Sequence, residues 1–146
     1  MALYFLDTEF NGFNGELISL ALVREDGESI SLVFGCDDPV EWVKDNVMPI
    51  LFSDPVSKKT KRTEAGREIA AFLKGDKNPT IISDWPEDIS QLCGCLITGP
   101  GEMVNIRSIA FRIVRVDAYP TDLKGAVQHN AWWDAMALRH LLGSHR

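Results

Sequence analysis

Hydrophobic and polar positions follow a strand-like pattern over the first part of the chain. The continuous apolar run Leu3–Leu6 predicts a central strand that is buried on both faces. After a turn rich in glycine and asparagine, Leu17–Val23 predicts a second apolar strand. Asp26-Gly27 is a strong hairpin signal leading into a third strand, Ser29–Phe34. We therefore expect the first three strands to form a meander.

Helical spacing replaces this pattern from about residue 40. Apolar residues recur roughly every 3.6 positions over residues 40–51, which predicts a helix that stops or bends near Pro49. The basic run at residues 58–62 is interpreted as a solvated loop, with guidance of a phosphate backbone as the alternative. Thr63 is the predicted N-cap of a second helix, whose apolar positions span residues 65–73.

The rest of the chain alternates strands with helices. Residues 80–83 predict a short strand, and Pro86 occupies the position of a helix N1 proline, with helical apolar spacing through Leu96. Residues 109–116 are β-branched and interrupted by arginines, as in an exposed strand. Asn130 is the predicted cap of the last helix.

The order of these elements predicts the fold class. Three strands followed by alternating helices and strands indicate an α/β sheet with helices on its faces. The length of 146 residues favours one domain, residues 1–146, without an internal repeat or a linker.

Charge and cysteine content limit the classes of function. The net charge of −6 argues against the broad basic surface of a duplex-binding protein, yet an acidic cluster that holds Mg²⁺ would create its own local positive charge. No apolar run approaches the roughly 20 residues of a membrane span, and the first residues lack the basic lead of a secretory signal. Three cysteines, which cannot all pair with one another, favour reduced thiols and a cytoplasmic location.

Asp7 and Glu9 are the first candidates for chemistry. They lie two residues apart at the end of a buried strand, so both side chains point to the same face. Two like charges at this spacing are costly unless a cation lies between them. Acidic residues are also common where an ordinary strand leads into a turn, so this pair alone does not define a site.

Two further acidic segments lie where helices begin. Asp84 and Asp88 flank the start of the mid-chain helix, where a carboxylate can also act as a cap or stabilise the helix dipole. His129 and Asp134 stand at the start of the last helix. Because five residues turn a helix by roughly 500°, the pair can meet only if His129 lies in the preceding loop and folds back.

Taken together, the three segments resemble the DEDD superfamily of 3′–5′ exonucleases, in its DEDDh branch that includes RNase T and proofreading exonucleases. The resemblance covers essentially the whole chain. Within the family, the chain is most similar to the small stand-alone exoribonuclease-like members. The matching segments are Phe5–Phe10, Glu16–Val23, Ile81–Leu92 and His129–Ala135.

This resemblance implies an RNase H-like mixed sheet with helices on both faces, and a two-metal phosphodiester hydrolase. It implies that two ions are held by Asp7, Glu9, Asp88 and Asp134, with Asp7 as the bridge. All-oxygen ligands favour Mg²⁺ or Mn²⁺. His129 matches the general base of the family, for which an imidazole is suited at neutral pH. Glu9 matches the contact to the terminal 3′-hydroxyl.

The second motif departs from the family pattern. The family often has asparagine four residues before the metal ligand and an aromatic residue just before it, whereas this chain has Asp84 and Glu87. Asp88 is the predicted ligand because it aligns when the apolar residues of the helix face the core. Asp84 is the alternative ligand, and a shared role for both is left open.

Aromatic residues near the motifs are candidates for contacts to bases. Phe10 follows the first motif, and Trp85 lies between the two acidic candidates of the second, so both are predicted to bind substrate. Of Trp132 and Trp133, one is expected to pack into the core and the other to lie beside the active site.

The predicted function is 3′–5′ hydrolysis of single-stranded nucleic acid, with RNA preferred over DNA on the resemblance alone. One alternative is a catalytically silent nucleic-acid-binding module on the same fold, although binding alone does not require four carboxylates and a histidine. Another is a Ca²⁺-stabilised structural domain, but its ligands would be grouped in one loop. The sequence does not specify the oligomeric state, and a homodimer is left open.

Overall fold

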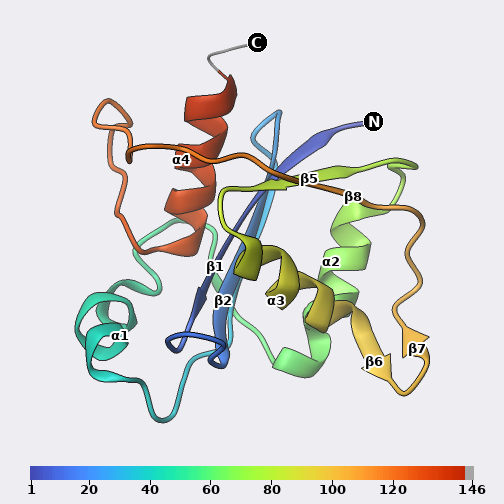
Figure 1. Ribbon diagram of the computed structural model, residues 1–146, viewed down its shortest axis with the longest axis horizontal. Helices are drawn as coiled ribbons and strands as arrows, with labels where there is room; N and C mark the ends of the chain where they lie inside the picture. The colour runs from blue at the N-terminus through green and yellow to red at the C-terminus, as the bar shows by residue number, and fades with distance from the viewer. Residues whose placement is uncertain (144–146) are drawn as a thin grey trace.

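The computed structural model describes residues 1–143 (Figure 1). Its strands are β1 (Leu3–Phe10), β2 (Leu17–Arg24), β3 (Ser29–Val33), β4 (Lys58–Lys59), β5 (Thr80–Ser83), β6 (Ile97–Gly99), β7 (Glu102–Met103) and β8 (Ala110–Ile113). Its helices are α1 (Glu41–Asn46), α2 (Ala65–Leu73), α3 (Pro86–Leu96) and α4 (Ala131–Gly143), with the short 3-10 helices η1 (Met48–Ile50) and η2 (Arg62–Glu64).

Six strands form one mixed sheet in the order β4-β3-β2-β1-β5-β8. The strands β1, β2 and β3 form the predicted meander, with antiparallel pairing throughout. Parallel pairing joins β5 to β1, β8 to β5, and β4 to β3. The predicted α/β fold class is confirmed, and the mixed sheet is compatible with an RNase H-like fold.

Helices cover both faces of this sheet. On one face α4 packs against β1 and β2, while α2 and α3 pack against each other on the opposite face (Figure 1). The contact beneath α4 includes three alanines, Ala21 of β2 and Ala131 and Ala135 of the helix, which pack together with Val23 and Trp132. Small side chains let the helix approach the sheet closely, which brings the first turn of α4 next to β1.

Predicted helix starts are confirmed at two of three positions. Pro86 is the first residue of α3, as expected. Asn130 caps α4, because its Oδ1 accepts a hydrogen bond of 2.9 Å from the main-chain N–H of Trp133. The prediction for Thr63 is wrong. It lies within η2, and the α2 start has no side-chain cap, because Arg62 fixes the turn by bonding to the carbonyl oxygens of Leu17 and Gly35.

The basic run also differs from its prediction as a solvated loop. Lys58 and Lys59 pair in parallel with the end of β3 and extend the sheet by one short strand. The helix expected over residues 40–51 is divided as predicted near Pro49, into α1 and η1. No helix within residues 1–143 has both the length and the apolar character needed to cross a bilayer.

Candidate active site

The site begins on β1, which presents Asp7 and Glu9 on the face covered by α4. Their cross-strand partners on β2 are Ala21 opposite Asp7 and Ser19 opposite Glu9. Directly opposed residues of an antiparallel pair share a face. Because both partners are small, space remains above the sheet for the two carboxylates and for a third one from α4.

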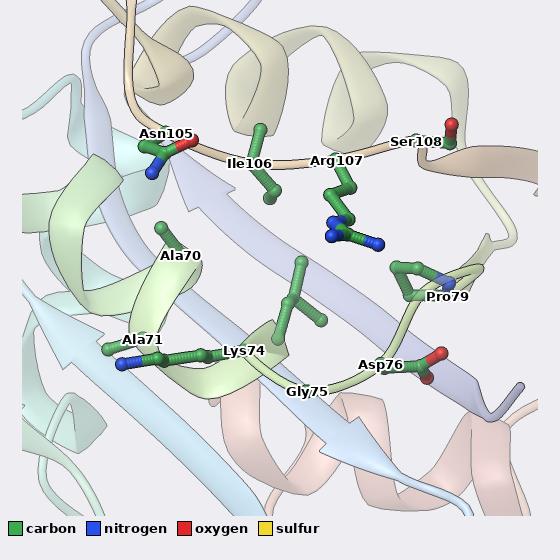
Figure 2. Close-up of a pocket in the computed structure, with 11 residues that line it drawn as sticks. Ala70, Ala71, Lys74, Gly75, Asp76, Pro79, Asn105, Ile106, Arg107 and Ser108 are labelled. Atoms are coloured by element: carbon green, nitrogen blue, oxygen red, sulfur yellow. The ribbon is translucent and has the colours of Figure 1, made fainter.

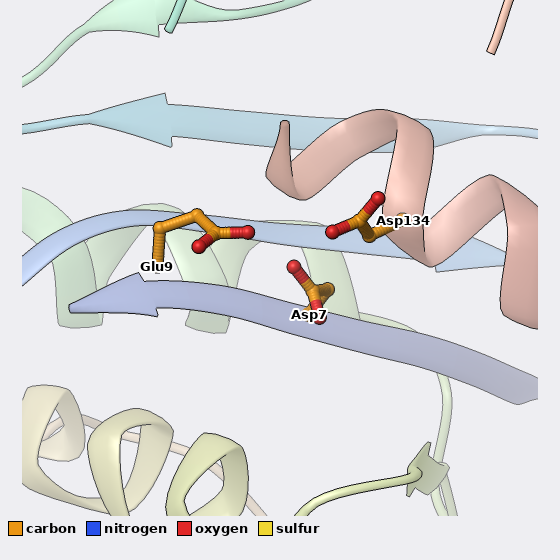
Figure 3. A group of neighbouring side chains, drawn as sticks. All are labelled: Asp7, Glu9 and Asp134. Carbon is orange, nitrogen blue, oxygen red and sulfur yellow. The ribbon is translucent and has the colours of Figure 1, made fainter. Parts of the chain in front are cut away.

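Asp134 supplies that third carboxylate from the first turn of α4. Figure 3 shows the carboxyl groups of Asp7 and Glu9 turned toward that of Asp134 between the strand and the helix. One oxygen of each residue lies within 4.8 Å of one oxygen of each of the others. This spacing would let a single divalent cation contact all three residues.

A second group of carboxylates lies on the other side of Asp7. Asp84 follows β5 and Asp88 lies in the first turn of α3, and each has an oxygen within 4.8 Å of Asp7 and of the other. Asp7 therefore belongs to both groups. The five predicted or alternative acidic ligands are brought together by β1, β5, α3 and α4.

Asp88 is the most firmly held of these residues. It is 3% exposed, and its two oxygens accept hydrogen bonds of 2.7 Å from the hydroxyls of Thr8 and Ser83. A carboxylate has about four lone-pair positions, so both oxygens keep the capacity to bind a cation. These bonds fix the orientation of Asp88 at the edge of the site.

Asp84 does not have the capping role that sequence reasoning allowed it. The N-cap residue of α3 is Trp85, and no side chain caps this helix. The strand β5 ends just before Asp84, which places the carboxylate beside Asp7 instead of over the helix N-terminus. Asp84 is therefore a candidate ligand together with Asp88.

Negative charge is concentrated in this cluster. Burial, reinforced by the other carboxylates, raises the pKa values of Asp7 and Glu9 well above their ordinary range. Burial also raises the pKa of Asp88 to about 6, against the opposing effect of the Thr8 and Ser83 hydrogen bonds, and that of Asp134 to about 7. The site is thus costly to ionise without a compensating positive charge.

Unpaired polar atoms collect at the same place. Among the described residues, three buried side-chain oxygens have no hydrogen-bond partner: Asp7 Oδ2, Ser19 Oγ and the Tyr119 hydroxyl. Ser19 is the cross-strand neighbour of Glu9, and the negative charge of Asp134 adds to burial in raising the pKa of Tyr119. Buried polar groups without partners are rare, and the orphaned oxygen of Asp7 is chemically suited to bind a cation.

His129 lies at the rim of the cluster. It lies in the loop before the helix, as predicted, and has a left-handed backbone (φ 73°). Its main-chain N–H donates to the Asp134 carboxylate, while its ring lies edge-on to Trp42 with ring centroids 5.0 Å apart. The predicted return of His129 over Asp134 is confirmed for the main chain.

Two adjoining hollows surround the carboxylates and share Asp7 and Asp84. One, of about 320 Å³, is lined by His129, Asp134 and Tyr119 among others. The other, of about 310 Å³, is lined by further residues from β1, α1 and α3. The predicted substrate contacts Glu9, Phe10 and Trp85 all line this second hollow, together with Trp42 and Asp88.

Sequence reasoning missed Trp42 and Tyr119. The apolar spacing of residues 40–51 indicates only which side of α1 is buried. Trp42 is 53% exposed and faces the site, so this spacing gave no signal for it. Tyr119 lies in an irregular segment between β8 and α4, which has no periodic pattern. Trp132 packs in the core as one of the tandem tryptophans was expected to, but Trp133 bonds to the carbonyl of Ser53 and lines neither hollow.

A separate hollow of about 340 Å³ lies between α2 and residues 105–108 (Figure 2). It is at the opposite end of the sheet, since its one acidic residue, Asp76, bonds to the main-chain N–H of Ala2 just before β1. That carboxylate also accepts hydrogen bonds from Tyr4 and from the main chain of Asn78. This hollow therefore lacks the free carboxylates that distinguish the cluster at Asp7.

Neither a family model nor a curated protein sequence matches this chain. The site is therefore interpreted from its own geometry.

Proposed function

We propose that this protein is a divalent-metal-dependent 3′–5′ exonuclease of the DEDDh type that acts on single-stranded nucleic acid, with RNA preferred over DNA. The observation that carries the proposal is the pair of carboxylate groups that share Asp7: Asp7, Glu9 and Asp134 in one, and Asp7, Asp84 and Asp88 in the other. A shared carboxylate between two oxygen-lined positions is what a two-metal phosphodiesterase requires.

The residues fit divalent cations in two respects. The donor atoms are all carboxylate oxygens, which favour Mg²⁺ or Mn²⁺ over metals that prefer nitrogen or sulfur. Asp7 Oδ2 is buried without a hydrogen-bond partner, and a cation would satisfy it. Cations would also compensate the repulsion that raises the pKa values of Asp7 and Glu9.

The chain's own groups have separate tasks in this reaction. When bound, the two ions supply Lewis-acid stabilisation of the phosphate charge and favour deprotonation of the attacking water. A ring nitrogen of His129 accepts the proton of that water. The water oxygen forms a bond to phosphorus as the bond to the 3′-oxygen of the penultimate nucleotide breaks, which releases a nucleoside 5′-monophosphate. Glu9 accepts a hydrogen bond from the terminal 3′-hydroxyl.

Aromatic side chains provide the walls of the substrate site. Phe10, Trp42 and Trp85 line one hollow beside the carboxylates. Stacking of a base on an aromatic ring contributes about 1–3 kcal/mol with little dependence on sequence. These residues would hold the terminal nucleotide with its phosphate toward Asp7. A cytoplasmic setting belongs to the same proposal and rests on three free cysteines, Cys36, Cys93 and Cys95.

Digestion of 5′-labelled and 3′-labelled single-stranded RNA and DNA of equal sequence tests the function. With Mg²⁺ or Mn²⁺, the 5′ label should give a ladder that shortens one nucleotide at a time, and the 3′ label should appear at once as a mononucleotide. EDTA and Asp7→Asn should each abolish the ladder. The matched control is Asp45→Asn, which changes an exposed carboxylate on α1. This variant should have the same activity as the unmodified protein.

Two results would contradict the proposal. Binding of the oligonucleotide without cleavage in either metal would identify a catalytically silent binding module. Full activity of Asp7→Asn would show that the carboxylate groups around Asp7 are not the reaction centre.

A further inference from the structure

Arg115 lies at the edge of the carboxylate cluster, in the segment that follows β8. The N–H of Val114 bonds to the carbonyl of Ser83 at 2.9 Å, which continues the alignment of this segment with the end of β5. The side chains of Val114 and Val116 pack against a core cluster. Alternation along an extended segment then turns Arg115 outward, toward the side where Trp85 and Asp84 lie.

The guanidinium of Arg115 is placed over the ring of Trp85, with Cζ 5.3 Å from the ring centroid. The indole is itself held, because its Nε1 donates a hydrogen bond of 3.2 Å to Glu87. Stacking on an indole face restricts where an arginine can point without using any of its N–H donors. Trp85 therefore acts as a platform that keeps Arg115 beside the cluster.

This guanidinium has no other partner within residues 1–143. Arg24, Arg62 and Arg67 form ion pairs with acidic residues, and Arg139 bonds to a main-chain carbonyl. Among the described residues, Arg107, Arg112 and Arg115 form no hydrogen bond or ion pair. Of these three, Arg115 is the one that stacks on Trp85 and lies close enough to Asp84 for its charge to act on that carboxylate. Burial raises the pKa of Asp84, and the positive charge of Arg115 acts in the opposite direction.

The exposed guanidinium of Arg115 keeps its N–H donors available for an anion beside the acidic cluster. The substrate class that fits is a phosphodiester, because a guanidinium matches the geometry of two phosphate oxygens. The carboxylates cannot attract a polyanion by themselves, and the chain carries a net charge of −6. A fixed cation at the entrance to the cluster would guide and orient the nucleic-acid backbone.

We propose that Arg115, positioned by Trp85, forms a phosphate subsite for the backbone linkage of single-stranded nucleic acid next to the one that is cleaved. The subsite extends the proposed exonuclease function and rests on it. Trp85 is a positioning residue for Arg115, in addition to lining the hollow at the terminal nucleotide.

The test measures binding separately from turnover. Fluorescence anisotropy with a labelled single-stranded hexanucleotide, in Ca²⁺ and over a range of KCl, gives Kd and its salt dependence. Arg115→Ala should raise Kd about tenfold, as expected for loss of a charge-assisted hydrogen bond. It should also reduce the slope of log Kd against log salt by about 0.7, the value for one phosphate contact on a single strand.

Matched variants separate a specific contact from a loss of general charge. Arg112→Ala removes an equal charge from an exposed position on β8 and leaves the contact between Arg115 and Trp85 in place, so it should leave both values unchanged. Arg115→Lys should recover part of the affinity. Trp85→Leu should also reduce the salt slope, because it releases Arg115, and in the double variant the effects on the salt slope should not add.

Oligonucleotides with one neutral methylphosphonate linkage locate the contact. The effect of Arg115→Ala should disappear when the linkage next to the 3′-terminal one is neutral, and persist when any linkage farther from the 3′ end is neutral. An unchanged Kd and salt slope in Arg115→Ala would overturn the subsite, as would an equal effect of Arg112→Ala. If the unmodified protein cleaves RNA normally in these cases, only the subsite fails. If it neither binds nor cleaves, the proposed function fails as well.

Discussion

The main-chain N–H of His129 donates to both carboxylate oxygens of Asp134, at 3.2 Å and 3.1 Å. The imidazole ring takes no part in this bond and remains at the rim of the site. Asp134 is thus oriented by the backbone of the residue proposed as the general base. Removal of the ring should therefore leave the carboxylate in place.

This separation predicts the behaviour of His129 variants. His129→Gly removes the ring and suits the left-handed backbone (φ 73°), where an alanine would add strain. We expect turnover to fall by about 10²–10⁴-fold, the usual contribution of a general base. The Mg²⁺-induced rise in Tm should be unchanged, because the proposed metal ligands are untouched. Single-turnover kinetics and thermal unfolding test this, and normal turnover would remove His129 from the reaction.

The raised pKa values predict how the metal-free protein responds to pH. The pKa values of Asp88 and Asp134, about 6 and about 7, lie above those of the unfolded chain. The folded state therefore binds more protons between about pH 4 and pH 7, so its stability should fall as pH rises through this range. Each tenfold difference in proton affinity corresponds to about 1.4 kcal/mol.

Urea unfolding in EDTA from pH 5 to pH 8 measures this decline. Saturating Mg²⁺ should oppose it, since deprotonated carboxylates bind the ion more tightly. Asp7→Asn should make the metal-free decline shallower by removing one of the repelling charges. A metal-free protein whose stability increases with pH over this range would contradict the charge distribution described for the cluster.

Removal of the Asp84 and Asp88 carboxylates should lower the unfolding free energy by different amounts. Asp88→Ala leaves the buried hydroxyl of Thr8 without its acceptor, while that of Ser83 keeps the carbonyl oxygen of Trp85, so we expect a loss of about 1–3 kcal/mol of unfolding free energy at pH 5. Asp84→Ala should be close to neutral at that pH, because its side chain caps no helix. Both variants should lose much of the Mg²⁺-induced rise in Tm, whereas Asp117→Ala, a nearby carboxylate outside both groups, should keep it.

Trp42 should contribute to substrate affinity and little to stability. Its ring is 53% exposed and lines the hollow beside Glu9, so Trp42→Ala should raise KM about tenfold or more through lost base stacking. Trp42→Phe should recover part of this loss. Phe52→Ala is the control, because Phe52 is similarly exposed and lines neither hollow. An unchanged KM in Trp42→Ala would exclude a stacking role.

The sequence predicted those parts of the fold that depend on local pattern. The meander of β1 to β3 follows from apolar runs and the Asp26-Gly27 turn, and the start of α4 follows from Asn130. The start of α2 was not predicted correctly, because tertiary bonds from Arg62 set it and no capping residue is present. The two-residue strand β4 is likewise a product of its neighbour β3.

The candidate site was predictable to the extent that it lies on regular elements. Asp7, Glu9 and Asp134 could be placed because strand alternation and a helix start determine their directions. The role of Asp84 was ambiguous in the sequence, because a carboxylate before a helix can be either a helix cap or a metal ligand. The pairing of β5 with β1, which places Asp84 beside Asp7, decides between these two roles. Arg115 belongs to the predicted strand over residues 109–116, but the sequence did not show that this strand lies beside Asp84 and Trp85. Tyr119 lies in an irregular segment, so its approach to the cluster depends on packing that no local pattern encodes.

Both edges of the six-stranded sheet end in short strands with basic side chains. Lys59 lies on β4 at one edge and Arg112 on β8 at the other, and both are exposed. A second copy that added a strand to either edge through the same edge of its own sheet would bring like charges together. The edge strands also offer only two residues of backbone on β4 and four on β8 for pairing. The short length of both edges and these two charges therefore disfavour addition of a further strand, even though β8 also exposes Phe111 and Ile113.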